Sequence, residues 1–158
     1  MGVTVTGVAA AQKELADVGK RAADLRPVMR VAVEDLKSFT SDRFDGEVDP
    51  EGKKWKDLSP EFAAARRRGP GAGQDIKILT DTARMRNSFS GSAFVDGMEF
   101  GFSADYAEDH HKGIGVTQRR LLPMTDDLSD TTTEGPGGRY WSDTREMVDR
   151  YIHTGRVV

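Results

Sequence analysis

Two short strand-like runs joined by Asp96-Gly97 constrain the fold of this chain more than any other feature. The runs cover residues 89–95 and 98–102, and in the second run apolar residues alternate with polar residues or glycine, the pattern of a strand with one buried face. Asp96 and Gly97 both tolerate positive φ, which favours a type I′ turn. We therefore predict an antiparallel hairpin, with an apolar face formed by Met98, Phe100 and Phe102.

The strongest helix signal lies over residues 27–44. Its apolar side chains recur at helical spacing, and most of the charged side chains lie off that face. A second helical pattern covers residues 10–25, and Pro27 between the two marks a kink or a new helix start. We expect this long helix to pack across the sheet through Val28, Val31, Ala32, Leu36 and Phe39.

The two ends of the chain complete the predicted fold. The β-branched start at Val3, Val5 and Val8 predicts another strand of the same sheet, and residues 119–124 predict an edge strand. Ser142 is the predicted cap of a C-terminal helix that ends at Gly155, with an apolar face formed by Met147, Val148, Tyr151 and Ile152.

The predicted fold class is therefore α+β. An antiparallel sheet is crossed by a long N-terminal helix that is kinked or split near Pro27, and a C-terminal helix follows. Residues 1–158 are predicted to form a single domain, with a flexible GPGAG link at 69–73 and a flexible loop at 125–138.

Composition excludes several kinds of site. The chain has 158 residues, no cysteine and a formal charge of −3, so disulfides, thiolate metal sites and cysteine nucleophiles are excluded. The balanced charge gives no general attraction to nucleic acid or to an anionic membrane. Neither a signal peptide nor a run of ~20 apolar residues is present. We expect a soluble protein with no cofactor and no membrane partner.

Two polar clusters suggest catalytic or metal chemistry, but both lack the required spacing. His110 and His111 follow three carboxylates in 105–109, yet adjacent histidines on a helix point about 100° apart and no HExxH-like pattern is present. Ser88, Asp105 and His110 lack a nucleophile elbow. We therefore predict no metal site and no enzymatic activity.

Two groups of arginines form a candidate phosphate-binding patch if the fold brings them together. Little aromatic interleaving and no nucleic-acid motif accompany them, so a solvated or subunit-contacting surface is the preferred interpretation. A small nucleic-acid-binding module remains an alternative function. The residues concerned are Arg66, Arg67, Arg68, Arg119 and Arg120.

Two segments, read in order, resemble one known family. The first carries the pattern F, then P-x-G-x-x-W-x-x-L, formed by Phe44, Pro50, Gly52, Lys53, Trp55 and Leu58. The second contains Ile78-Leu79, an Asp81-Thr82 turn, Met85, Ser88, Gly101, Tyr106-Ala107, His110 and Gly113. In this order and spacing, residues 10–124 resemble the phage virion morphogenesis family, the tail-completion proteins of Mu-like and related tailed phages.

The resemblance implies a structural virion protein that is made in the bacterial host cytoplasm and joins tail to head late in assembly. It implies a homo-oligomeric ring in the neck, with a hexamer favoured, between head connector or adaptor proteins and tail tube or terminator proteins. DNA would at most pass through the lumen of the ring. A tail terminator or a head-side connector adaptor is the alternative.

The contact surfaces of such a ring are predicted in the loop 45–58 and the segment 106–115. Trp55 closes the loop 45–58. We prefer the interpretation in which its side chain caps the long helix to one in which it contacts a partner. The candidate interface residues are Trp55, Leu58, Arg66, Arg67, Arg68, Tyr106, His110, His111, Arg119 and Arg120.

Three features depart from the family pattern. Ala83 stands where the family usually has glycine, which predicts a more helical turn before Met85. Residues 120–123 match the family's proline- and arginine-bearing segment only loosely, and residues 125–138 resemble an insertion.

Overall fold

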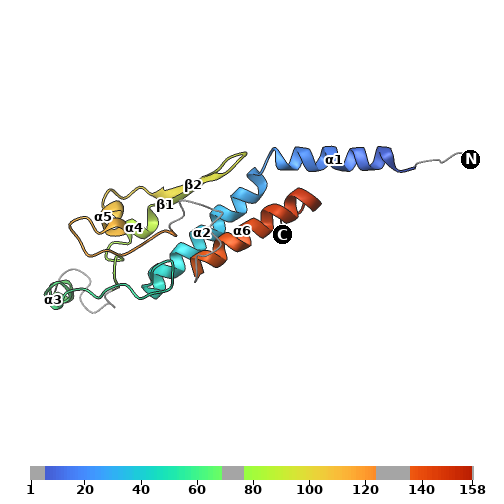
Figure 1. The fold of residues 1–158 in the computed structure, drawn as a ribbon. Coiled ribbons are helices and arrows are strands. Elements are labelled where there is room, and N and C mark those ends of the chain that lie inside the picture. Colours follow the sequence, from blue (N-terminus) through green and yellow to red (C-terminus); the bar gives the residue numbers. More distant parts are fainter. Residues whose placement is uncertain (1–5, 69–76, 124–135, 158) are drawn as a thin grey trace, which may run out of the picture.

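The computed structural model describes residues 6–68, 77–123 and 136–157. The protein is elongated, with α1 extending from one end and α3 at the other (Figure 1). Helices and an antiparallel hairpin make the fold α+β, as predicted. The elements are α1 (Val8–Ala22), α2 (Arg26–Gly46), α3 (Pro60–Arg68), α4 (Arg84–Asn87), β1 (Phe89–Ala93), β2 (Met98–Phe102), α5 (Ala107–Lys112) and α6 (Pro136–Thr154).

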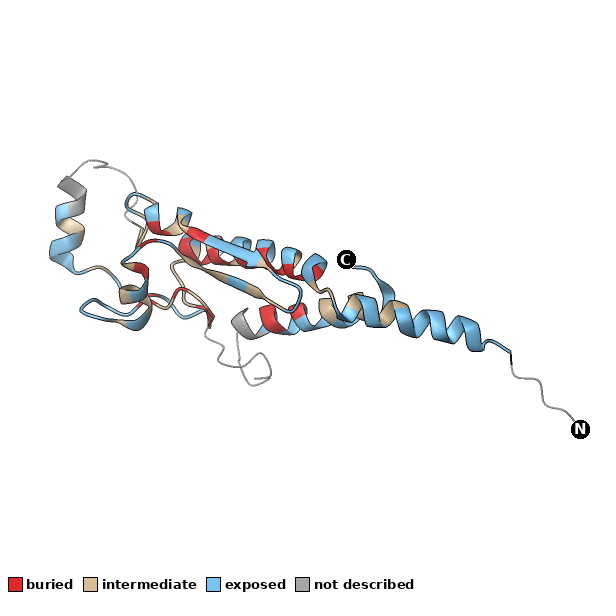
Figure 2. Cartoon of the chain, turned by 90° about the horizontal axis from the view of Figure 1, so that it is seen from above, coloured by how far each residue is buried: buried red, intermediate tan, exposed pale blue. Residues whose placement is uncertain are grey.

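Helix α2 is the centre of the subunit, packing against β1 and β2 and also against α6. Pro27 lies in its first turn and separates it from α1, which confirms the predicted split. The buried face is wider than a single stripe, because Met29 and Val33 are buried beside the predicted Val28, Ala32 and Leu36. Figure 2 shows this buried surface running along α2 between its neighbours, whereas α1 is almost wholly exposed.

The hairpin forms as an antiparallel pair in which Ala93 is opposite Met98. Its connection, residues 94–97, is longer than the predicted two-residue turn. The type I′ prediction is wrong, because neither Asp96 nor Gly97 has a positive φ. The loop instead contacts the start of α2, where the Leu25 N–H donates to the Val95 carbonyl at 2.8 Å.

The apolar face of β2 packs toward α2 and α6, where Met98, Phe100 and Phe102 are half-buried. The predicted third strand does not form around Val8, which begins α1, and residues 1–5 lie outside the described part. The predicted edge strand at 119–124 is also wrong over residues 119–123, which have no strand pairing. Their backbone groups bond to α5 and to Trp55 instead.

The C-terminal helix begins at Pro136, so the cap predicted at Ser142 is wrong and Ser142 lies inside α6. The earlier turns bury Tyr140 and Trp141 against α2 and the sheet. The Tyr140 hydroxyl donates to the Ala32 carbonyl at 2.6 Å, and burial raises the pKa of Tyr140 to about 12. The predicted stop is confirmed, since Gly155 has φ 76° and its N–H donates to Tyr151 O.

The predicted link at 69–73 and residues 125–135 of the predicted loop lie outside the described residues, whereas 136–138 belong to α6. Within the described ranges, no helix has both the length and the apolar character needed to cross a membrane.

The turn before α4 is not the more helical turn predicted for alanine. Ala83 has φ 54°, the left-handed conformation that favours glycine, and its carbonyl accepts the Asn87 N–H at 2.9 Å. An ion pair ties α4 to the end of α2, because Arg86 and Asp45 lie 2.7 Å apart. Alanine therefore occupies a glycine-like position in a turn that is fixed by its surroundings.

Replacing Ala83 with glycine is expected to raise the free energy of unfolding by about 0.5–1 kcal/mol. Left-handed geometry costs a non-glycine residue roughly 1–2 kcal/mol, and the greater entropy of glycine in the unfolded chain offsets part of that gain. Urea unfolding measures the change. Ala16→Gly, at an exposed position inside α1, is the matched control and should lower stability by up to about 1 kcal/mol. A loss in Ala83→Gly equal to that of the control would contradict the prediction.

Candidate interaction site

The loop 45–58 is held against the body of the subunit. Arg43 donates to the Asp49 carbonyl, and the Asp49 carboxylate accepts the Lys53 N–H at 2.8 Å. Trp55 is only 5% exposed, packs edge-on against Phe44 and donates from Nε1 to Arg120 O. Trp55 thus caps the C-terminal end of α2 from within the core, as the preferred interpretation stated.

Helix α5 is bonded to the segment 119–121 that follows it in the sequence. The Arg119 N–H donates to the His110 carbonyl at 2.7 Å, and the Leu121 N–H donates to His111 Nδ1 at 3.1 Å. Desolvation on burial, followed by the nearby arginine charges, lowers the pKa of both histidines. Among the described residues no group of three or more His, Cys, Asp or Glu side chains could hold a metal ion.

Acidification is expected to destabilise the protein through these histidines. Their folded pKa values lie below the ordinary 6.5, so the unfolded chain takes up protons first. The stability that the two neutral histidines contribute is fully present above pH 6.5, and it is lost as the pH drops through their folded pKa values. Protonation of His111 also removes the acceptor for the Leu121 N–H. Thermal unfolding between about pH 7.5 and about pH 5 measures the loss.

The variant His111→Asn keeps an acceptor for Leu121 without a titrating ring, so it should show a smaller loss than the wild type. His153, which is exposed on α6, supplies the matched control His153→Asn, for which the loss should persist. An identical pH dependence in the wild type and His111→Asn would contradict the assignment.

Two members of the candidate arginine patch, Arg119 and Arg120, are engaged in contacts within the protein. Arg119 is 6% exposed and its guanidinium donates to Lys56 O at 2.9 Å, while burial lowers its pKa. Arg120 pairs with Glu51 at 2.9 Å. Residues 66–68 end α3, and their side chains lie outside the description. Arg119 and Arg120 therefore fasten the loop 45–58 within the subunit.

Ser88, considered as a nucleophile, has a structural role. Its hydroxyl donates to Met85 O at 2.8 Å and accepts the Ala104 N–H at 3.2 Å. Asp105 instead contacts Arg84, at 3.2 Å. These bonds join α4 to the segment before α5.

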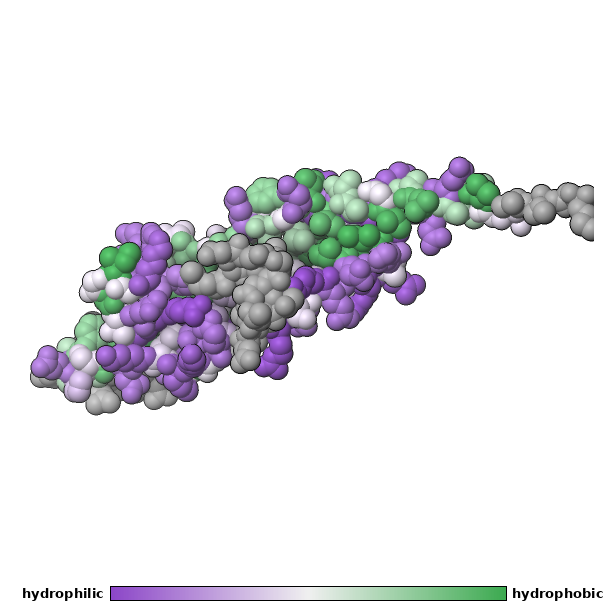
Figure 3. Space-filling view, viewed as in Figure 1, coloured by the Kyte–Doolittle hydropathy of each residue, from purple (hydrophilic) through white to green (hydrophobic). Residues whose placement is uncertain are grey.

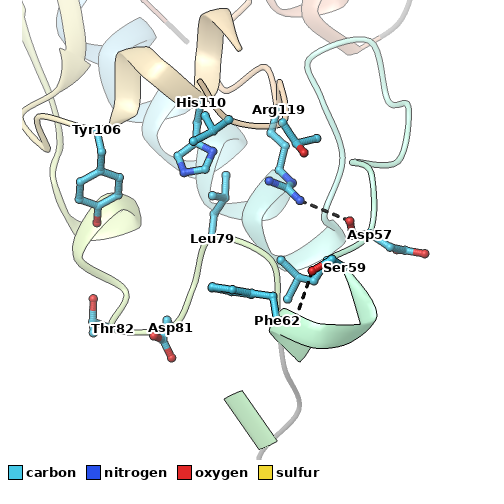
Figure 4. A pocket seen from close by; sticks show the side chains of 12 residues that line it. Asp57, Ser59, Phe62, Leu79, Asp81, Thr82, Tyr106, His110 and Arg119 are labelled. Carbon is cyan, nitrogen blue, oxygen red and sulfur yellow. Dashed lines mark hydrogen bonds between the residues drawn. The ribbon is translucent and has the colours of Figure 1, made fainter. Parts of the chain in front are cut away.

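An apolar pocket of about 470 Å³ lies between α3, α5 and the segment around Leu79, and we call it the α3–α5 pocket. Phe62 lies across the opening from His110 and Tyr106 (Figure 4), and its side chain is 55% exposed. Leu58, Tyr106, His110 and Arg119, all candidate contacts, meet here. The pocket is lined by Asp57, Leu58, Ser59, Phe62, Leu79, Asp81, Thr82, Tyr106, His110, Val116, Thr117 and Arg119.

Phe62, Leu79 and Val116 were not among the contact residues predicted from the sequence. Ser59 caps the start of α3, because its Oγ accepts the Phe62 N–H at 3.2 Å, and this cap sets where Phe62 emerges. One signal was available, because Phe62 is the one large apolar residue in the sequence of a short helix that ends in three arginines.

A second apolar surface lies at the other end of the subunit, where α1, the tip of the hairpin and the C-terminal part of α6 meet (Figure 3). Leu15 is 71% exposed and Val8 52% exposed on α1, and Phe94 and Val95 are about half exposed at the tip. None of the residues of α1 is buried.

The sequence of the chain matches a known protein family. A model of the phage virion morphogenesis family matches residues 6–138, from the start of α1 into α6. The chain belongs to the phage virion morphogenesis family. The resemblance found in the sequence is thereby confirmed, and membership gives the chain a structural or morphogenetic role in a phage virion. We found no significant match among curated proteins or among solved structures.

Proposed function

We propose that this protein completes the phage tail and joins it to the head, acting as a non-enzymatic ring in the neck of the virion. The observation that carries the proposal is the family match over residues 6–138, which spans both exposed apolar ends of the subunit. Its partners are further copies of itself, the tail tube or terminator on one side, and the head connector or adaptor on the other.

The distribution of polar side chains supports a binding role over a catalytic one. In the described part of the chain, the candidate nucleophile Ser88 and the ring of His111 are used in bonds that hold segments together. The apolar residues that remain accessible, such as Leu15 and Phe62, lie at the two ends of the subunit. Exposed apolar patches on a polar protein are typical of protein contacts.

A nonsense mutation in the gene tests the proposal. Lysates of the mutant phage should contain filled heads and separate tails, and supplying the wild-type protein from a plasmid should restore joined particles. Joined, infectious particles in the mutant lysate would refute the function. Electron microscopy of intact virions, with copy number and axial position assigned, then separates tail completion from a terminator or a head-side adaptor.

A further inference from the structure

Helix α1 carries an apolar seam that its own subunit leaves largely uncovered. Val8, Ala11, Leu15, Val18 and Ala22 recur at alternating spacings of three and four residues, the pattern of a helix that packs along one narrow line. No residue of this 15-residue helix is buried. An isolated helix of this length is marginally stable in water, so a partner along the seam would stabilise it.

The contact with α6 covers only the end of the seam. Arg21, in the last turn, donates from Nε to Ile152 O at 2.7 Å and from Nη2 to His153 O at 3.1 Å. The N-terminal turns extend beyond the body of the subunit (Figures 1 and 2). Val8, Ala11 and Leu15 therefore remain available to another chain.

The α3–α5 pocket at the opposite end has the properties of a receptor for such a helix. It is open and apolar, and Phe62 and Val116 are 55% and 42% exposed at its wall. Its volume of about 470 Å³ lies in the range of sites that enclose bound groups. Amphipathic helices bind such grooves through side chains at spacings of three, four and seven residues, which Val8, Ala11 and Leu15 supply.

Charge favours the same pairing. The lining includes two carboxylates, Asp57 and Asp81, against one guanidinium, Arg119. The turns of α1 that project carry one cationic side chain, Lys13, and one anionic side chain, Glu14, and are formally neutral, so they bring no net negative charge to these carboxylates. The N-terminal end of α1, positive through the helix dipole, is the end that projects from the subunit.

We propose that the seam of α1 in one copy of this chain docks into the α3–α5 pocket of the next copy. The inference rests on the self-association in the proposed function and assigns the two surfaces that make it. Because the surfaces are unlike and lie at opposite ends, each copy both donates a helix and receives one. Repetition of such a head-to-tail contact closes into a ring when the rotation permits.

The small area of one contact favours a closed ring of copies over an isolated dimer. The projecting part of α1, from Val8 to Leu15, is about 12 Å long, and half its surface is about 190 Å², so one contact buries roughly 400 Å² in total. That is below the roughly 1,200 Å² of stable two-protein interfaces. Closure engages the helix and the pocket of every copy and doubles the area per subunit, so assembly is expected to be cooperative. A symmetric α1–α1 pair would stop at the dimer and leave the pocket uncovered.

Cysteine cross-linking of the purified protein tests this contact directly, because the chain has no cysteine of its own. The single variants Ala11→Cys and Val116→Cys, mixed and mildly oxidised, should give a disulfide-linked 1:1 heterodimer in preference to either homodimer. The double variant should give a ladder that ends at the closed ring. Circular dichroism verifies that each variant is folded, as expected for substitutions at exposed positions.

The matched control is Ala16→Cys, which lies on the face of α1 away from the seam and should cross-link poorly with Val116→Cys. In the double-cysteine background, Leu15→Asp should lower the cross-linked fraction at least about tenfold, the effect of losing a buried anchor. Ala16→Asp should leave it unchanged. Equal cross-linking from positions 11 and 16, homodimers of Ala11→Cys alone, or a protein that is monomeric at every concentration would each overturn the contact.

This readout is independent of phage assembly. If cross-linking succeeds while the nonsense mutant still yields joined particles, the proposed function fails and the contact stands. If the mutant yields separate heads and tails but positions 11 and 116 do not cross-link, the function stands and the contact is wrong.

Discussion

Replacing Phe44 with alanine is expected to lower the free energy of unfolding by about 3–5 kcal/mol, the usual cost of deleting a buried phenylalanine. Phe44 is 1% exposed and lies where α2 meets the loop 45–58 and the sheet. Its ring packs edge-on against Trp55 at 5.4 Å and against Phe102 at 6.0 Å. Few neighbours can collapse into the space, because the loop is anchored independently by Asp49 and Arg119.

Chemical denaturation followed by tryptophan fluorescence measures this loss, since Trp55 reports on the ring that is removed. Phe44→Leu keeps most of the volume and should cost only about 1.5 kcal/mol. Phe39→Ala, on the same helix but only half-buried, should cost less than Phe44→Ala. A loss below about 1 kcal/mol for Phe44→Ala would show that the cluster around Trp55 does not form as described.

The sequence predicts α2 and the hairpin because both signals are local. Apolar residues recur every three or four positions from Val28 onward, Pro27 marks the start, and β2 alternates over Met98–Phe102. The details that fail depend on contacts between distant segments. The hairpin loop is set by Leu25 bonding to Val95.

The start of α6 fails for the same reason. The glycines at 137 and 138 argue locally against a helix, yet the turn that carries Tyr140 is held by its bond to Ala32, far away in the sequence. Similarly, the segment 119–123 taken alone favours an apolar strand. Its Arg120 carbonyl instead accepts a bond from Trp55, which is distant in the sequence.

The α3–α5 pocket could be predicted only in part. Tyr106 and His110 were predicted as contacts because they lie in the segment 106–115, which carries part of the family resemblance. Phe62 and Leu79 are recognised as pocket residues only in the folded structure, because the pocket joins segments that are separate in the sequence. The spacing of apolar residues within one segment does not predict which distant segments lie next to it.

Gly91 carries the other large expected effect, because it lets α2 approach β1. A Cβ atom at this position would lie 2.7 Å from Val33 Cγ1 and 3.1 Å from the Glu99 carbonyl oxygen. Real Cβ contacts are not that short, and valine on a helix is stiff about χ1, so the helix or the strand has to move. Gly91→Ala is expected to lower the free energy of unfolding by about 1–3 kcal/mol, and Gly91→Val by more. Gly101→Ala, which has open space, is the matched control and should cost far less.

A double-mutant cycle with Val33 identifies the cause of that loss. Val33→Ala alone removes buried methyl groups and should cost about 1–2 kcal/mol, but it also removes the atom nearest to the new Cβ. The pair Gly91→Ala with Val33→Ala should therefore cost less than the sum of the single losses, by at least about 1 kcal/mol. Relief stays incomplete because the Glu99 carbonyl is still close. Strictly additive losses, measured by urea unfolding of all four proteins, would mean that the approach of Val33 is not what requires glycine here.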